Sequence, residues 1–333
     1  MKRSFLLPLL ALLFIIAFLL SFSVGRFPIK PMMLVRILFS HILPIERDWS
    51  EMMESVVFNI RLPRLLAASL IGAGLSLSGL VYQIIFRNPM VSPDVLGTST
   101  GAGFGAALGL FFGFSSLGVS FLAFLTGLAA VFLVWQVGRA VPSNQVLGLI
   151  LGGIMISSLF QSATSFIKLV ADPENQLPAI TYFLMGSLAG VGEEELRILA
   201  PPVLAAFIPL LALSWQLNLL SLSEEEALSL GVNTRLLRGI AVVASSLMTA
   251  SAVAVSGVIG WVGLVIPHIT RFMTGPDARR SVPCSMLLGA SFLILVDTVS
   301  RTLTTSEVPI GILTSFLGAP FFLYLILKEG RKA

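Results

Sequence analysis

The sequence is poor in the residues that soluble domains use to cover their surface and in the cysteines that hold small folds together. Only 11% of its 333 residues are charged, whereas a soluble domain carries about 25%. Its one cysteine, Cys284, excludes an internal disulfide and a thiolate cluster for a metal. Hydrophobic residues make up 56% of the chain, and the mean hydropathy is +0.96. Most of its surface must therefore face lipid.

Apolar runs divide the chain into segments that match the thickness of a bilayer. A membrane-crossing helix needs about 20 apolar residues, because its backbone must satisfy its own hydrogen bonds in lipid. We therefore predict an all-α polytopic membrane protein, with about ten transmembrane helices in one domain over residues 1–333. The predicted spans are 4–24, 62–85, 97–113, 117–138, 146–169, 198–215, 237–256, 258–273, 284–303 and 310–327. Two of the ten are short and are interrupted by glycine or proline.

Charge placement predicts the orientation of these spans. Lys2 and Arg3 precede the first span, whose apolar stretch is longer than a signal-peptide core and lacks a cleavage site, so we expect a retained helix. Ten spans put both termini on one side. The short loops follow the positive-inside rule, most clearly at Arg271, Arg279 and Arg280, although the first outer loop is also basic. Both termini are therefore predicted to be cytoplasmic.

A weak internal similarity relates two parts of the chain. Arg61-Leu62-Pro63-Arg64 opens a span that passes through Ser78-Gly79, and Arg235-Leu236-Leu237-Arg238 opens one that passes through Ser256-Gly257. The first span starts outside and the second inside, as an inverted-topology repeat requires. The pattern predicts repeats at 61–170 and 235–328, and chance similarity is the alternative.

Two polar features lie at the predicted inner side. Pro89 and Pro93 forbid a continuous helix, so the segment from Asn88 to Asp94 is either a connecting loop or a constriction into which Asn88 and Met90 point. Further on, Ser223 and Glu226 form a capping box, and Gly231 ends the short helix that they begin. Such a helix docks on a partner or is a solvated turn.

A run of small residues and one histidine could each form a binding site or have a purely structural role. The run from Gly97 to Ala106 contains a GxGxxA string, but no strand precedes it, so a dinucleotide site is excluded. Close packing of membrane helices explains both this run and the glycines at 257, 260 and 263. His268 follows Pro267 and is either a structural side chain or a ligand or proton relay.

Three arginines stand at the predicted outer helix ends: Arg61, Arg64 and Arg301. Positive charge at a helix N-terminus opposes the helix dipole, and outside the membrane it opposes the positive-inside bias. The arginines either extend toward lipid phosphates or bind the carboxylates of a partner.

Two absences bear on the energy source. The sequence contains no Gly-Lys dipeptide and hence no Walker A phosphate loop, and it has no run of intramembrane carboxylates for a proton or sodium relay. A transporter without either feature must obtain its energy from another subunit.

Together these residues resemble the FecCD family of ABC-importer permeases, which move iron–siderophores, haem and vitamin B12. Four motifs, spread over residues 61–320, carry the resemblance. They are Arg61-Leu62-Pro63-Arg64; Arg87-Asn88-Pro89 through Pro93-Asp94-x-x-Gly97; Gly260-Trp261-Val262-Gly263 through Pro267-His268-x-x-Arg271; and Pro309-x-Gly311-x-x-Thr314-x-x-x-Gly318-x-Pro320.

The resemblance implies a homodimer of ten-helix subunits, with two cytoplasmic ATP-binding subunits and an external solute-binding protein. It implies that Arg61, Arg64 and Arg301 bind that protein, and that Asn88, Met90, Ser143 and Asn144 form the cytoplasmic gate. It also implies that the segment 216–234 couples to the ATPase. The coupling residues are Ser223, Glu226, Ala227, Leu228, Leu230, Gly231 and Val232.

The sequence thus predicts a non-enzymatic permease of the cytoplasmic membrane that imports an iron chelate, either a ferric siderophore or haem. No cofactor, metal or nucleic acid is expected, and lipid surrounds the chain. Vitamin B12 or an oxyanion is the alternative substrate within the family. A proton-coupled secondary transporter and a membrane receptor without transport are the rival functions.

Overall fold

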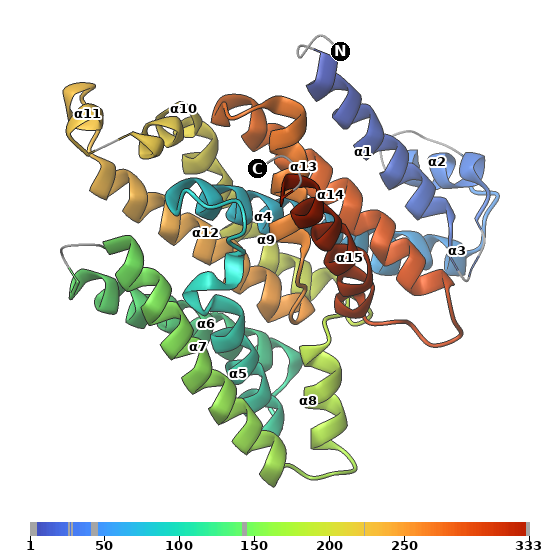
Figure 1. Ribbon diagram of the computed structural model, residues 1–333. Coiled ribbons are helices and arrows are strands. Elements are labelled where there is room, and N and C mark those ends of the chain that lie inside the picture. The colour runs from blue at the N-terminus through green and yellow to red at the C-terminus, as the bar shows by residue number, and fades with distance from the viewer. Residues whose placement is uncertain are drawn as a thin grey trace.

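The computed structural model describes residues 5–330, apart from 26, 28, 41–45, 142–144 and 223. Throughout this part of the chain, regular structure is helical and no strand forms. The start of α1, the end of α15 and the small helix α11 all lie toward the top of Figure 1. The described ends of the chain are therefore on one side, as an even number of crossings requires.

The first half of the chain runs from α1 to α8. Its elements are α1 (Leu6–Ser23), α2 (Pro31–Phe39), α3 (Glu51–Ser55), the π-helical η2 (Val56–Arg61), α4 (Leu62–Ile85), the 3₁₀ turn η3 (Pro93–Leu96), α5 (Thr98–Phe111), α6 (Ser116–Arg139), α7 (Gln145–Val170) and α8 (Gln176–Leu184). The second half contains α9 (Glu193–Ala212), α10 (Ser214–Leu217), the 3₁₀ turn η4 (Asn218–Ser221), α11 (Glu224–Ser229), α12 (Thr234–Ser256), α13 (Val262–Thr274), α14 (Ala278–Thr302) and α15 (Ile310–Gly330).

Each of the ten predicted spans coincides with a helix. The agreement is closest for α4, predicted and found at 62–85, whereas α9 begins five residues before the predicted start at 198. Within the described residues, seven helices are long and apolar enough to cross a bilayer; the apolar stretch of α15 at Ile310–Tyr324 is shorter. The sequence did not predict α2, α8 or the π-helical turns that extend α4 outward.

Two of the spans are only partly helical, as their glycines and prolines predicted. α5 and α13 have 14 and 13 residues, about 20 Å each at 1.5 Å per residue, and an irregular segment precedes each of them. Gly257 ends α12 with φ +69°, and a Cβ there would lie 1.9 Å from the carbonyl oxygen of Phe183. Only glycine combines this backbone conformation with so close an approach.

The buried centre of the bundle is formed by α4 and α12, which pack against each other. Around them α4 also packs on α13 and α14, and α12 packs on α5 and α6. Each central helix thus packs on two helices of the other predicted repeat, an arrangement expected of an inverted repeat. We retain the boundaries 61–170 and 235–328 as a proposal. Hydroxyls cross the central contact, where Ser78 Oγ donates to Ser245 O at 2.9 Å and the Tyr82 hydroxyl lies 2.7 Å from Ser246 Oγ.

Candidate functional site

The three outer arginines come together from different elements. Arg61 ends η2, Arg64 lies in the first turn of α4, and Arg301 lies in the last turn of α14. Their exposed fractions are only 5%, 5% and 9%. The fold therefore brings the predicted docking residues into one cluster but places them beneath the surface, and their role toward a partner stays a prediction.

Arg64 is held by two carboxylates. Its Nε donates to Asp297 Oδ1 at 3.0 Å, and its Nη2 donates to the same oxygen at 2.7 Å. The opposite edge of the guanidinium binds Glu307, with Nη1 to Oε1 at 3.1 Å and Nη2 to Oε2 at 2.8 Å. Asp297 is fully buried, whereas the Glu307 side chain is 21% exposed. Arg64 thus joins the start of α4 to α14 and to the loop before α15.

Arg61 and Arg301 instead cap the C-terminal end of α1. Arg61 donates to Phe22 O at 2.6 Å and also to Phe27 O, and Arg301 donates to Ser21 O at 3.1 Å. The last carbonyls of a helix have no partner within the helix and carry partial negative charge. Two guanidiniums satisfy them here, so α1 is built into the outer end of the bundle.

Asp297 and Glu307 are functional candidates that sequence reasoning missed. Asp297 is the one carboxylate within an otherwise apolar span, and it lies four residues before Arg301 on α14, a spacing that brings side chains together. That intramembrane charge was an available signal, because such residues require a partner. Glu307 lies in a loop and gave no comparable signal.

The predicted inner constriction is a tight turn after α4. Asn88 Oδ1 accepts a hydrogen bond from the backbone N–H of Met90 at 2.9 Å, and both residues are exposed, Met90 by 50%. The structure therefore places the pair at a surface, and the gate role stays a prediction. The other two predicted gate residues, Ser143 and Asn144, lie outside the described residues.

Arg87 connects this turn to the predicted coupling segment. Its Nε and Nη2 donate to Leu220 O at 3.1 and 3.0 Å, and Nη2 also donates to Leu222 O at the base of α11. Its backbone has φ +49°, an uncommon conformation for a side-chain-bearing residue. The sequence motif contained Arg87, but nothing in the sequence showed which carbonyls it binds.

The coupling segment is also fixed on its other side. Asn218 Nδ2 donates to Asp277 Oδ1 at 3.0 Å, and Asn218 Oδ1 accepts from the Ala278 backbone at 2.7 Å. The Asn218 hydrogen bond is the main cause that lowers the pKa of Asp277, which lies in the loop before α14. The residues just before α11 are therefore bonded both to the inner turn and to the start of α14.

The short helix α11 projects away from the bundle at the upper left of Figure 1. Ala227 is fully buried, whereas Leu228 and Leu230 are 60% and 57% exposed and Glu226 is exposed too. The helix ends at Ser229, and the turn after it contains Gly231, with φ +76°. The Val232 backbone then donates to Ala227 O at 3.0 Å. Its predicted cap, Ser223, lies outside the described residues. Exposed leucines on a projecting helix are available for a docking contact.

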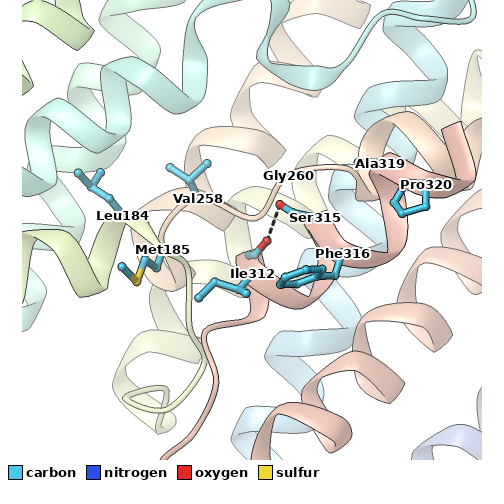
Figure 2. Close-up of a pocket in the computed structure, with 10 residues that line it drawn as sticks. Leu184, Met185, Val258, Gly260, Ile312, Ser315, Phe316, Ala319 and Pro320 are labelled. Atoms are coloured by element: carbon cyan, nitrogen blue, oxygen red, sulfur yellow. Dashed lines mark hydrogen bonds between the residues drawn. The ribbon is translucent and has the colours of Figure 1, made fainter. Parts of the chain in front are cut away.

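An apolar cavity of about 680 Å³ lies where α8, the segment before α13 and α15 meet. Figure 2 shows Leu184 and Met185 on one side, Val258 and Gly260 behind, and Phe316 and Pro320 on α15. Ser315 Oγ donates to the Gly311 carbonyl at 2.7 Å, so the one hydroxyl lining the cavity is already bonded within its helix. The cavity thus has largely apolar walls, and its volume lies within the range of small-molecule sites, roughly 300–1,000 Å³.

A second cavity of about 430 Å³ borders the first, and polar side chains form part of its largely apolar lining. The two share Leu184 and Val258. Its polar side chains come from η3, α5 and α7: Asp94, Ser99, Thr100, Gln161, Thr164, Ser165 and Lys168. Ser99 donates to Asp94. Lys168 has no ion pair within the described part of the chain.

The face of α7 beside this cavity carries an exposed polar stripe. Ser158, Gln161, Ser162 and Ser165 follow helical spacing and are all exposed on a span of which only 22% is buried. Polar side chains in a membrane face a bundle interior or a water-filled cavity rather than lipid. The stripe therefore marks a surface that is suited to a second protein surface or an aqueous pathway, although Ser165 Oγ already donates to Gln161 O at 2.9 Å.

Comparisons with known proteins agree with this arrangement. The family model of the FecCD transport family matches residues 13–328. The chain is 42% identical to the molybdate import system permease protein MolB of Haemophilus influenzae, covering 97% of this chain and 95% of that protein. It is 43% identical to a probable iron chelatin transport system permease of Helicobacter pylori (strain 26695), covering 82% of each. It is 38% identical to the hemin transport system permease HmuU of Yersinia pestis, covering 84% and 85%.

A solved structure agrees as well. It is described as an inward-facing conformation of a metal-chelate type ABC transporter, and it shares 41% identity and a TM-score of 0.86 over 97% of this chain and 98% of that chain. Membership of this family implies partner ATP-binding subunits and a substrate-binding protein. On the match over nearly its whole length, the chain belongs to the FecCD transport family and is the multi-pass membrane permease component of an ABC importer.

Proposed function

We propose that this permease imports an iron chelate, a ferric siderophore or haem, across the cytoplasmic membrane. The observation that carries the proposal is the apolar cavity of about 680 Å³ between α8 and α15. Chelates present a large organic surface, which apolar walls can contact, whereas a small oxyanion needs several hydrogen-bond donors. Relatives named for iron chelatin and hemin support this substrate class.

We further propose that two copies of the chain form the pathway. The polar stripe on α7 is unsuited to lipid and would line an aqueous route if a second copy faced it. Both termini and α11 would then be cytoplasmic, which agrees with Arg271, Arg279 and Arg280 at the inner loops. The arginine cluster of Arg61, Arg64 and Arg301 would lie outside and bind an external solute-binding protein.

Energy would enter through α11. We propose that Leu228 and Leu230 seat in a groove of the cytoplasmic ATP-binding subunit, with Ala227 as the buried base of the helix. Movement of α11 would reach the inner turn through the bonds from Arg87 to Leu220 and Leu222. Asn88 and Met90, with Ser143 and Asn144, would open as the gate at that end.

An oxyanion is the second candidate substrate, and two observations favour it. The molybdate permease matches nearly the whole chain at 42% identity. The second cavity supplies Lys168 and several hydroxyls, which are donors that an oxyanion requires. The nearby carboxylate of Asp94 opposes an anion there, which is why the chelate is preferred.

Binding of candidate substrates to the solute-binding protein of the same transport system tests the substrate class. We expect ferric siderophores or haem to quench its intrinsic fluorescence at micromolar concentration or below, and molybdate to have no effect at a hundredfold excess. Uptake of radiolabelled iron should follow the same order. Saturable binding of molybdate without binding of chelates would overturn the proposal and establish the oxyanion.

A further inference from the structure

A third cavity, of about 250 Å³, lies between the start of α1 and the start of α14. It shares no lining residue with the two cavities described above. Asn218, just before α11, bonds to the first residue of α14, so the cavity is on the α11 side of the bundle. The residues that line it are Leu6, Leu7, Thr274, Arg279, Arg280, Pro283 and Cys284.

One wall of this cavity is apolar and continues onto the lipid-facing surface. Leu6, Leu10 and Cys284 form a small buried cluster between α1 and α14, and Met273 packs against it. Phe272, near the end of α13, is 84% exposed, and α1 exposes large apolar side chains along its length. Exposed apolar surface on membrane-spanning helices faces hydrocarbon, so a molecule in the cavity could extend directly into the bilayer.

Two arginines form the opposite, cationic rim. Both are exposed, and the Arg280 side chain makes no hydrogen bond or ion pair within the part of the chain that the structure describes. Arg279 Nε lies 4.0 Å from Asp277 Oδ1, at the limit of an ion pair. That oxygen already accepts hydrogen bonds from Asn218 Nδ2 at 3.0 Å and from the Arg279 backbone at 3.1 Å. Two guanidiniums against one carboxylate leave the rim with a net positive charge.

A cationic rim beside an apolar wall is complementary to an anionic phospholipid. The arginines lie in the first turn of α14, where a spanning helix leaves the hydrocarbon and meets the phosphates of its leaflet. Guanidinium binds phosphate bidentately, and basic pockets between transmembrane helices bind anionic headgroups. A free phosphate ion would meet the same arginines but gain nothing from the apolar wall, so the wall favours the lipid.

We propose that this cavity binds the headgroup of an anionic phospholipid. Arg279 and Arg280 would hold its phosphate, and Leu6, Leu7 and Cys284 would contact its glycerol backbone and the first carbons of its acyl chains. The cavity is too small for a whole lipid, so the rest of the chains would lie on the exposed face of α1. The site depends neither on the proposed substrate nor on the proposed docking surfaces.

Lipid titration of the full-length permease in mild detergent, followed by native mass spectrometry, tests this site. Phosphatidylglycerol and phosphatidylcholine with the same acyl chains would be compared. We expect one tightly bound phosphatidylglycerol per chain, with an affinity at least fivefold above that of phosphatidylcholine. The double variant R279Q/R280Q should lose this preference, and R279K/R280K should keep most of it. R139Q, which removes an exposed arginine at the predicted inner end of α6, should change it less than twofold.

Two further measurements separate a lipid from a phosphate ion. Phosphatidylglycerol should slow alkylation of Cys284 in the wild type at least threefold, because the lipid covers the wall that contains this thiol, and should not slow it in R279Q/R280Q. L7W, which keeps the charge but narrows the apolar wall, should weaken phosphatidylglycerol. Inorganic phosphate at millimolar concentration should not displace the lipid.

Three results would overturn the proposal. Equal affinity of the wild type for the two lipids would exclude a selective site. Equal losses in R139Q and R279Q/R280Q would show that attraction is spread over all inner arginines. Displacement by inorganic phosphate, with L7W unchanged, would establish a phosphate ion site in place of a lipid site.

Discussion

Replacement of Asp297 by asparagine should destabilise the permease more than any exposed charge change. Asp297 is fully buried and binds Arg64 and Arg301 together, so D297N keeps the shape of the side chain but leaves two guanidiniums short of a carboxylate. Breaking a buried ion pair by removing one partner costs about 3–5 kcal/mol. At about 1.4 kcal/mol per tenfold change, the population of molecules in which α14 has separated from its neighbours rises on the order of 100- to 1,000-fold or more.

The single cysteine provides the assay for this change. Cys284 is 3% exposed in the native protein, so its alkylation by a maleimide in mild detergent reports opening of α14. D297N should raise the alkylation rate in proportion to the open population. Substitution of the part-exposed Glu307 by glutamine should raise it much less, and D48N, which breaks an exposed pair with Arg36, should leave it nearly unchanged. A D297N rate within threefold of wild type would refute the reasoning.

Three further changes test the coupling route and the central packing. L228D on α11 should reduce co-purification of the ATP-binding subunit and uptake together, since it puts a charge into an apolar contact, and unchanged co-purification would exclude a docking role. R87Q should keep the subunit bound but lower uptake at least tenfold, because the link to the inner turn is lost; wild-type uptake would contradict this. G257A should abolish accumulation of folded protein, whereas G190A, which has open space around it, should accumulate normally. Fluorescence-detected chromatography of solubilised membranes would measure both.

The helices could be predicted because lipid imposes a strong and local signal. Each span is a run of apolar residues, and the turn chemistry of Gly97, Gly231 and Gly257 marks where helices start or stop. The positions of α2 and α8 could not be predicted, because their short, mixed sequences lack the length that a crossing requires. Short elements of this kind are fixed by tertiary contacts.

The candidate site was only partly predictable for a related reason. The sequence identified Arg61, Arg64 and Arg301 by their positions at predicted outer helix ends, but not their burial, because the pairing of Arg64 with Asp297 joins residues more than two hundred positions apart. A separation of more than a hundred positions likewise hides the contact of Arg87 with the base of α11. Long-range side-chain partners depend on the fold as a whole, and no local sequence pattern contains them.

Energy-dependent uptake in proteoliposomes tests the central claim most directly. The permease would be reconstituted with its ATP-binding subunit and solute-binding protein, and uptake of a radiolabelled ferric chelate would be followed with ATP in the compartment that faces the ATP-binding subunit. The account predicts uptake that requires ATP, is abolished by vanadate, and is unaffected by an uncoupler. Uptake that continues without ATP and stops when the proton gradient is collapsed would contradict it.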